Sequence, residues 1–260
     1  MKRLLLIILI AGSGLGLCFS QEQTEEVLTN KKGVPVLPVA GNWAIGIDAT
    51  PLFQFAGNIF SFYGNEYVPT FGFTAQTPGA IFGKYKVSEN TAYRGALLIG
   101  VSNKTRNIAN PADENKPSKE AHTAIHLGII AGIEKNRTVF GRMVGIYGAQ
   151  VGLLKEPYYD DDSEMYGKLT FKDAENSDND YVETGGNTFG IMAGGFVGIE
   201  YFIVPRVALA GEFGLQLKIT TQQKRTLKPG VGSNTTLDYG GYGVELAPSQ
   251  SGNLQLLFYF

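Results

Sequence analysis

Residues 206–220 read RVALAGEFGLQLKIT, and this stretch decides the fold. From Val207 to Ile219 every odd position is apolar or glycine, whereas the even positions from Glu212 to Lys218 are polar or glycine. Successive side chains of a β-strand point to opposite faces, so a period of two is typical of a strand. An amphipathic helix would repeat its apolar residues every three or four positions. The stretch therefore predicts a strand with one apolar and one polar face.

The same alternation recurs along most of the chain. It is found in residues 42–55, 79–88, 91–104, 121–134, 139–153, 189–203 and 253–260. Two of these stretches are imperfect, because Val144 and Ile146 in one, and Phe196 and Phe202 in the other, place apolar side chains on the polar face. Together the stretches predict an all-β fold with eight antiparallel strands.

The connections between these stretches alternate between long and short. Residues 56–78, 105–120, 154–187 and 221–252 form the long connections, and residues 89–90, 135–138 and 204–206 form the short ones. An up-and-down transmembrane β-barrel has short turns at its periplasmic end and longer loops at its external end. We therefore predict that residues 42–260 form an eight-stranded antiparallel up-and-down transmembrane β-barrel with four long external loops. Ten strands remain an alternative if MYGKLTFKD (165–173) or GYGVEL (241–246) pairs into the barrel.

The N-terminal residues predict export. Residues 1–20 carry two basic residues, then an apolar run, then small residues, which is the layout of a secretory signal peptide. We expect the mature chain to begin near Gln21, with residues 21–41 as a periplasmic tail. Cys18, the only cysteine, leaves with the signal unless it is lipidated, and the bulky Leu17 before it argues against lipidation. The mature chain then has no disulfide and no thiol chemistry.

The apolar face of these strands could contact either lipid or the interior of a soluble barrel. No later apolar run is long enough for a membrane-spanning helix, so membrane insertion would require a closed barrel. A soluble lipocalin-like barrel is the alternative, with its apolar face inward. Glycines and charges of both signs on the polar face favour a crowded interior, and aromatic residues near the strand ends favour an interfacial girdle. These aromatic residues are Trp43, Phe53, Phe55, Tyr85, Tyr93, Tyr147 and Tyr201.

The last strand carries a family resemblance. Leu254, Leu256, Phe258 and Phe260 alternate in NLQLLFYF, which resembles the C-terminal signal by which outer-membrane barrels are recognised and inserted. From about Asn42 the chain resembles the eight-stranded barrels of the OmpA transmembrane domain and OmpX type. The resemblance implies the outer membrane of a Gram-negative bacterium, with both termini periplasmic. It also implies outer-membrane lipid, lipopolysaccharide and the barrel-assembly machinery as partners.

Two further features bear on that resemblance. Full-length OmpA continues into a peptidoglycan-binding domain after its last strand, and we expect no such domain here. The segment QEQTEEVLTNKKGVPVLPVAG (21–41) is similar to N-terminal tails of proteins from Bacteroidota-like bacteria.

The polar face predicts a filled interior. A barrel of eight strands is just wide enough to be filled by its own side chains, and unpaired charges there are costly. We therefore expect a plugged barrel with a network of paired charges, and a small-solute pore is the alternative for the same residues. The network is predicted to contain Asp48, Lys84, Arg94, Glu134, Arg142, Glu200, Glu212 and Lys218.

The two histidines do not predict catalysis. His122 and His126 fall on the polar face, where an imidazole can bind a metal or act as a base. No further ligands complete a metal site, and no nucleophile, base and orienting group can be assembled. The lipid A deacylase family has a lipid-facing His-x-Ser pair, whereas His126 is followed by Leu127 and Gly128. We expect no enzyme activity, metal or cofactor, with a lipid-modifying enzyme kept as an alternative.

The long loops are expected to carry the function. Residues 156–183 are acidic but lack the spacing of a calcium loop, which favours a solvated loop over a site for divalent bridging to lipopolysaccharide or a partner. Residues 58–73 are rich in aromatics and supply the candidate contact residues Phe62, Tyr63, Tyr67 and Phe71. We expect a structural, adhesive or partner-binding protein that contacts an extracellular or envelope protein. An accessory subunit of an envelope complex is an alternative. A net charge of -2 does not favour nucleic acid.

Overall fold

The computed structural model describes residues 28–29, 33, 35–49, 79–109, 116–159, 165–248 and 253–260. These residues form antiparallel strands and one short 3-10 turn, Ser177–Asn179. The predicted all-β antiparallel fold is therefore confirmed. Within the described ranges, no helix has the length and apolar character needed to cross a membrane.

Eight strands form what we call the main sheet. Each pairs antiparallel with two others, and the pairings that start at β4 lead through β3, β2, β1, β15, β11, β10 and β5 back to β4. Its members are β1 (Trp43–Asp48), β2 (Gly79–Ser88), β3 (Thr91–Ile108), β4 (Ser118–Phe140), β5 (Met143–Glu156), β10 (Thr188–Val204), β11 (Val207–Gln222) and β15 (Asn253–Tyr259).

The main sheet has one buried and one exposed face, because exposure alternates residue by residue along its strands. The register keeps the faces aligned: Glu200 lies opposite Ala210, and Ala210 opposite Gln255. The four residues that break the alternation, Val144, Ile146, Phe196 and Phe202, are all buried. The buried face is therefore apolar near the turns at Gly141–Arg142 and Pro205–Arg206, whereas the polar side chains of Lys86 and Asn136 lie on it near the turn at residues 89–90.

The short turns differ from prediction at one place. Residues 89–90 form the expected turn, but residues 135–138 continue β4, and the chain turns at Gly141–Arg142 instead. Gly141 adopts a φ of 50°, in the left-handed region that glycine tolerates at little cost. The polar sequence KNRT looked like a turn, yet its side chains alternate between buried and exposed as strand residues do.

The long connections contain further strands. They are β6 (Tyr158–Tyr159), β7 (Met165–Tyr166), β8 (Lys168–Lys172), β9 (Tyr181–Thr184), β12 (Arg225–Pro229), β13 (Thr235–Asp238) and β14 (Gly241–Pro248). Strands β8, β9, β12 and β13 pair in sequence beside the first residues of β4, and with the paired ends of β3 and β4 they form what we call the sheet extension. The prediction of loops for residues 154–187 and 221–252 was therefore wrong for these segments.

Neither candidate extra strand enters the main sheet as a new neighbour. β8 pairs with β4 at Lys119–Thr123, beyond the residues that pair with β5. β14 pairs with Leu215–Gln222 of β11, in line with β15, which pairs with Val207–Glu212.

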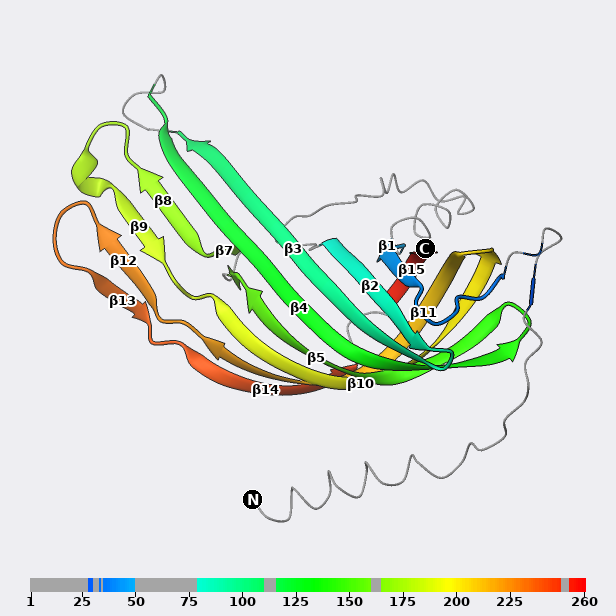
Figure 1. The fold of residues 1–260 in the computed structure, drawn as a ribbon. Helices are drawn as coiled ribbons and strands as arrows, with labels where there is room; N and C mark the ends of the chain where they lie inside the picture. Colours follow the sequence, from blue (N-terminus) through cyan, green and yellow to red (C-terminus); the bar gives the residue numbers. More distant parts are fainter. Residues whose placement is uncertain are drawn as a thin grey trace, which may run out of the picture.

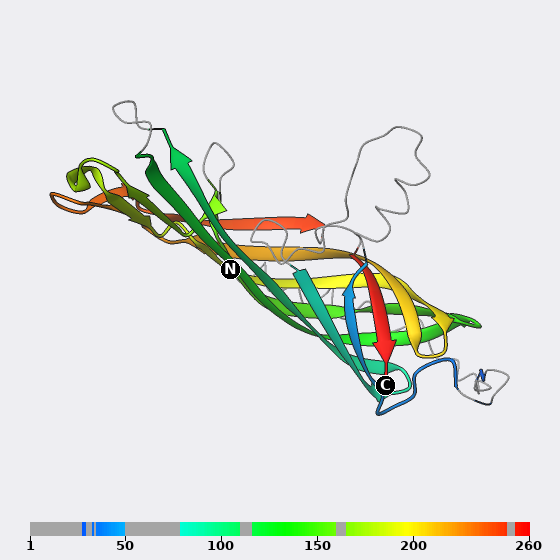
Figure 2. The same ribbon diagram turned by 90° about the horizontal axis from the view of Figure 1, so that it is seen from above.

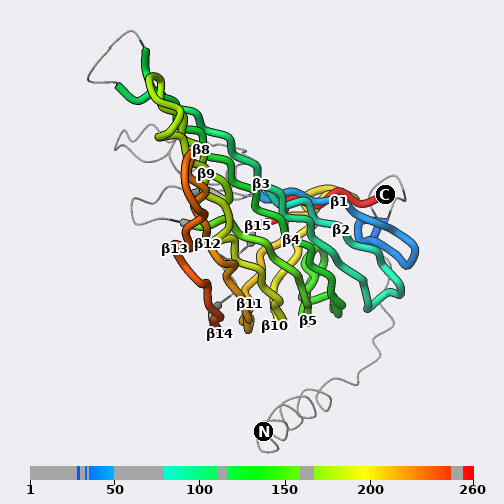
Figure 3. Tube along the Cα trace, turned by 90° about the vertical axis from the view of Figure 1, so that its left-hand side faces the viewer, coloured from blue at the N-terminus to red at the C-terminus, as the bar shows by residue number. Residues whose placement is uncertain are grey.

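The strands have very unequal lengths. In Figure 1, β3, β4, β8, β9, β12 and β13 extend far beyond the short β1, β2 and β15. Figure 2 shows β1 and β15 side by side, in agreement with their pairing. Figure 3 shows the sheet extension on the side opposite β1, β2 and the C-terminus.

Candidate functional site

A cluster of buried charges lies on the buried face of the main sheet. Lys84 of β2 contacts Glu134 of β4 at 2.9 Å and Glu200 of β10 at 3.6 Å, with all three side chains almost fully buried. These strands are far apart in the sequence, and the pairing of the main sheet turns the three side chains toward one another. The sequence pattern placed all three on one face, and the structure brings them into contact.

Arg94 joins a third carboxylate to this cluster. Its two terminal nitrogens each donate to one oxygen of Glu212 at 2.8 Å, and one of them also donates to Glu134 at 3.3 Å. The guanidinium carbon lies 4.1 Å from the ring centroid of Phe196, which adds a cation–π contact. Two-point pairing of this kind is among the stronger ion pairs in proteins.

Three polar residues outside the predicted network complete the cluster. The Tyr259 hydroxyl donates to Glu200 at 2.6 Å, and the Asn136 amide donates to Glu134 at 2.6 Å. Lys86 donates to the Asn136 oxygen at 3.0 Å. The alternation along the strands indicates the buried face for Lys86 and Tyr259, whereas the sequence predicts a turn at Asn136. Three cations, Lys84, Lys86 and Arg94, thus face three carboxylates, Glu134, Glu200 and Glu212, so the cluster is balanced in charge.

Lys218 belongs to a separate ion pair nearer the sheet extension. Its ammonium contacts both oxygens of Glu156 at 2.7 Å. It reaches across β10 at Gly190, where a Cβ would lie 3.6 Å from the Lys218 Cε. His126 lies within electrostatic range of both charges. The predicted partners of Lys218 were therefore wrong, since Glu156 was not in the predicted network.

The remaining two predicted network members lie elsewhere. Arg142 is exposed in the Gly141–Arg142 turn and donates to the backbone oxygen of Ile203 at 2.8 Å, so its assignment to the interior was wrong. The strand was expected to include this residue, whereas the strand begins after it. Asp48 is half-buried at the end of β1, in register with Gln255.

Apolar side chains flank the buried cluster on both sides. Toward the short turns, Val36 packs with Ile146, Phe202 and Leu257 in one apolar group. Val36 is only 1% exposed, so residues of the predicted N-terminal tail close this end of the buried face. Toward the sheet extension, Phe196 and then Met192 cover the cluster. These layers limit the access of water to the ion pairs.

The buried face of the sheet extension is also polar. Glu120 contacts both His122 and Arg106, with the Arg106 contact at 3.1 Å. Farther along, Arg225 contacts Glu183 at 3.2 Å. His122 and His126 thus share the buried face, as the parity predicted. Among the described residues, no group of three or more His, Cys, Asp or Glu side chains is placed to hold a metal ion.

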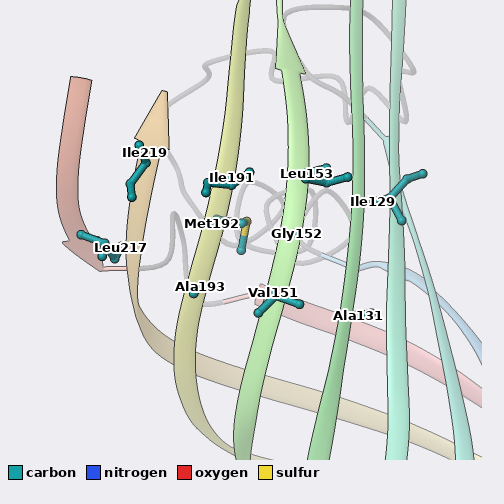
Figure 4. Close-up of a pocket in the computed structure, with 10 residues that line it drawn as sticks. All are labelled: Ile129, Ala131, Val151, Gly152, Leu153, Ile191, Met192, Ala193, Leu217 and Ile219. Carbon is teal, nitrogen blue, oxygen red and sulfur yellow. The ribbon is translucent and has the colours of Figure 1, made fainter. Parts of the chain in front are cut away.

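The exposed face of the main sheet is apolar over its whole width. Ile129, Val151, Val197, Phe213 and Leu215 are examples, each more than half exposed. Figure 4 shows part of this face, where a hollow of about 450 Å³ is lined by outward side chains of β4, β5, β10 and β11 together with Gly152 and Met192 of the buried face. Its lining is aliphatic apart from Gly152 and Met192.

The last strand contributes to both faces. Gln255, Leu257 and Tyr259 are buried, whereas Phe258 and Phe260 are exposed. Phe260 stacks on Trp43 with ring centroids 4.5 Å apart, near the short turns. The alternate positions Leu254, Leu256, Phe258 and Phe260 therefore share one face, as predicted. The candidate contact residues Phe62, Tyr63, Tyr67 and Phe71 lie outside the described residues.

A scan against protein-family models and a search of curated proteins found no match to this chain.

Proposed function

We propose that this protein is an eight-stranded β-barrel of a bacterial outer membrane with a plugged interior. In this proposal the main sheet closes into the barrel, its exposed face meets lipid, and the sheet extension with its loops stands outside the membrane. The external part acts as a structural, adhesive or partner-binding surface.

The exposed apolar face is the observation that carries the proposal. Soluble proteins rarely expose a contiguous apolar patch of more than a few hundred Å². Along β11 the outward-facing apolar side chains run from Val207 to Ile219, half-buried at Val207 and Leu209 and exposed from Phe213 onward, a length of roughly 40 Å at ~3.3 Å per residue. A strand tilt of about 40° would reduce that length to about 30 Å, which matches the hydrocarbon core of a bilayer.

The arrangement of polar groups agrees with this assignment. The charged side chains Lys84, Glu134 and Glu200 are nearly inaccessible, whereas large aliphatic side chains are exposed. A water-soluble barrel would require the reverse. Trp43, Tyr85 and Tyr93 are paired across neighbouring strands near the short turns, where an interfacial girdle is expected.

The buried cluster supports a plugged barrel over a pore. A conducting path would have to pass Arg94 and Glu212, which are held by two hydrogen bonds, and the apolar group around Phe202. Opening it would break several buried ion pairs at once, and each broken pair is costly.

Cell fractionation with heat modifiability tests the proposal. We expect the protein in the outer-membrane fraction, with an unboiled band on a detergent gel that migrates differently from the boiled one. Purified protein in planar bilayers should show no steady conductance. Recovery in the soluble periplasmic fraction without detergent would contradict the barrel proposal, and steady conductance would replace the plugged barrel by the pore.

A further inference from the structure

Five lysines share one face at the base of the sheet extension. Lys119 of β4 and Lys168 and Lys172 of β8 point the same way as Ile125 and Leu127, because alternate residues of a strand share a face and the pairs Lys119–Lys172 and Thr123–Lys168 are in register. The register of the neighbouring strands places Lys228 of β12 and Lys155 of β5 on this face as well. We call this surface the lysine face, defined by Lys119, Lys155, Lys168, Lys172 and Lys228.

No acidic side chain occupies the outward strand positions next to these lysines, although the acidic turn that begins at Asp173 directly follows Lys172. The neighbouring outward positions of β3, β4, β8, β9 and β12 hold lysine, threonine, asparagine, alanine or valine. The acidic residues Glu120 and Glu183 lie on the opposite, buried face. No salt bridge in the described part of the chain involves a lysine of this face. Since the chain has 24 acidic and 22 basic residues, composition does not explain this segregation.

Lys119 and Lys172 give the face a specific anion position. They are direct partners across β4 and β8, and both are exposed. Like charges opposite one another in a sheet are destabilising. An anion held between the two ammonium groups would remove this repulsion.

The position of the lysine face identifies the anion. It continues directly from the exposed apolar face, since Ile125 and Leu127 follow Thr123 along β4 on the same side of the strand. Thr123, Lys168, Thr184 and Thr226 form one row across four strands at this boundary. The lysines continue from this row to Lys119 and Lys172, four residues or roughly 13 Å farther along the strands. A strand tilt of about 40° reduces that distance to about 10 Å, a little beyond the layer of about 5–8 Å that lipid headgroups occupy outside the hydrocarbon core. Lys155 is half-buried at the boundary, where its stem can lie along hydrocarbon and its ammonium can reach the headgroups.

We infer that the lysine face binds phosphorylated headgroups of outer-leaflet lipids, with one phosphate between Lys119 and Lys172. This inference rests on the proposed outer-membrane barrel. Each lysine near an anionic surface contributes about a fivefold gain in affinity. Loss of the Lys119 and Lys172 charges should therefore weaken lipid binding roughly 25-fold, and salt should weaken the wild-type interaction.

The test uses the full folded protein in detergent micelles with added lipid A as the probe. Lipid phosphorus that remains with the protein after gel filtration is measured over a range of lipid A concentrations. The variant pair K119Q/K172Q is compared with K135Q/R142Q, which loses the same charge near the short turns. A second pair, K168Q/K228Q, covers the case in which the first does not fold. We expect weaker retention for both lysine-face pairs and retention within about twofold of wild type for the control.

Heat modifiability of the same samples separates the two proposals. A wild-type protein without a heat-dependent mobility shift would count against the barrel. A heat-modifiable lysine-face variant that retains lipid A as tightly as wild type would overturn the lysine-face inference alone. Full competition by inorganic phosphate at a concentration equal to that of lipid A would also overturn it, because the site would then bind free phosphate and not a lipid.

Discussion

Removal of Arg94 gives the sharpest test of the buried cluster. The Arg94 and Glu212 side chains are 8% and 5% exposed and share two hydrogen bonds of 2.8 Å. In Arg94→Met, Glu212 loses its bidentate partner and Glu134 loses one of its two cations. Loss of one partner from a buried ion pair typically costs about 3–5 kcal/mol, because the remaining charge stays buried. We expect a loss of that size in the free energy of unfolding.

The double variant separates the ion pair from packing. In Arg94→Met with Glu212→Leu, both charges are replaced by apolar side chains, and Glu134 keeps Lys84 at 2.9 Å. Apolar replacement of a whole buried pair is often close to neutral. The double variant should therefore be more stable than the sum of the two single changes predicts, with an interaction energy of at least about 2 kcal/mol.

Urea unfolding in lipid vesicles measures these differences. The only tryptophan, Trp43, reports the transition by fluorescence, and the mobility of unboiled samples on gels gives an independent signal. Arg142→Met is the matched control, because Arg142 is exposed and donates a hydrogen bond to the Ile203 backbone oxygen, so its loss should cost about 1 kcal/mol or less. The reasoning would be refuted by a cost below about 1 kcal/mol for Arg94→Met, or by additivity within about 0.5 kcal/mol in the double variant.

Three further predictions concern the exposed face, a glycine and an external carboxylate. Leu215→Arg should cost about 2–4 kcal/mol in lipid, whereas a change within about 0.5 kcal/mol would show that this 51% exposed residue faces water. Gly148→Ala should cost about 1–3 kcal/mol in the same unfolding assay, because its Cβ would overlap the Ile133 backbone oxygen, and Gly83→Ala should be tolerated, because no atom lies within 4 Å of its Cβ. Hydrogen bonds from the backbone amide of Glu175 and then from the Asn179 side chain lower the pKa of the Asp173 carboxyl. The ordering of this loop by the ionised carboxylate is therefore fully present above the ordinary Asp pKa, and it is lost as the pH falls through the lowered pKa. Amide exchange of residues 174–179 should rise over that window in the wild type, after correction for intrinsic rates, and an equal rise in Asp173→Asn would contradict this origin.

The sequence by itself determined the strands and the two faces of the main sheet. The period of two is a local property of the backbone, so the parity of Lys84, Arg94, Glu134, Glu200 and Glu212 was readable without knowledge of any contact. Residues 79–88 were assigned to a strand with the bounds that the structure has. The turn at residues 89–90 was likewise predicted from residues that adjoin one another in the chain.

Strand ends were less predictable than strand faces. Residues 135–138 are polar and were assigned to a turn, although the hairpin places Phe140 opposite Met143. Most of the sheet extension was missed for a similar reason, since short strands such as β9 and β12 gain their hydrogen bonds from distant partners and carry little local signal. Only β8 lies in a segment, residues 165–173, that the sequence had offered as an additional strand.

Only the tertiary structure decided which charges meet. The contact of Lys218 with Glu156 depends on the register of β5, β10 and β11 together, and on the absence of a side chain at Gly190 between them. The burial of Val144 and Ile146 depends on the apolar group at the end of the sheet, which residues of seven separate segments create. Whether a residue is at an odd or even position in its strand determines which face its side chain lies on. The register between strands determines which residues of other strands lie beside it. Register depends on long-range pairing, so no single segment of the sequence determines it.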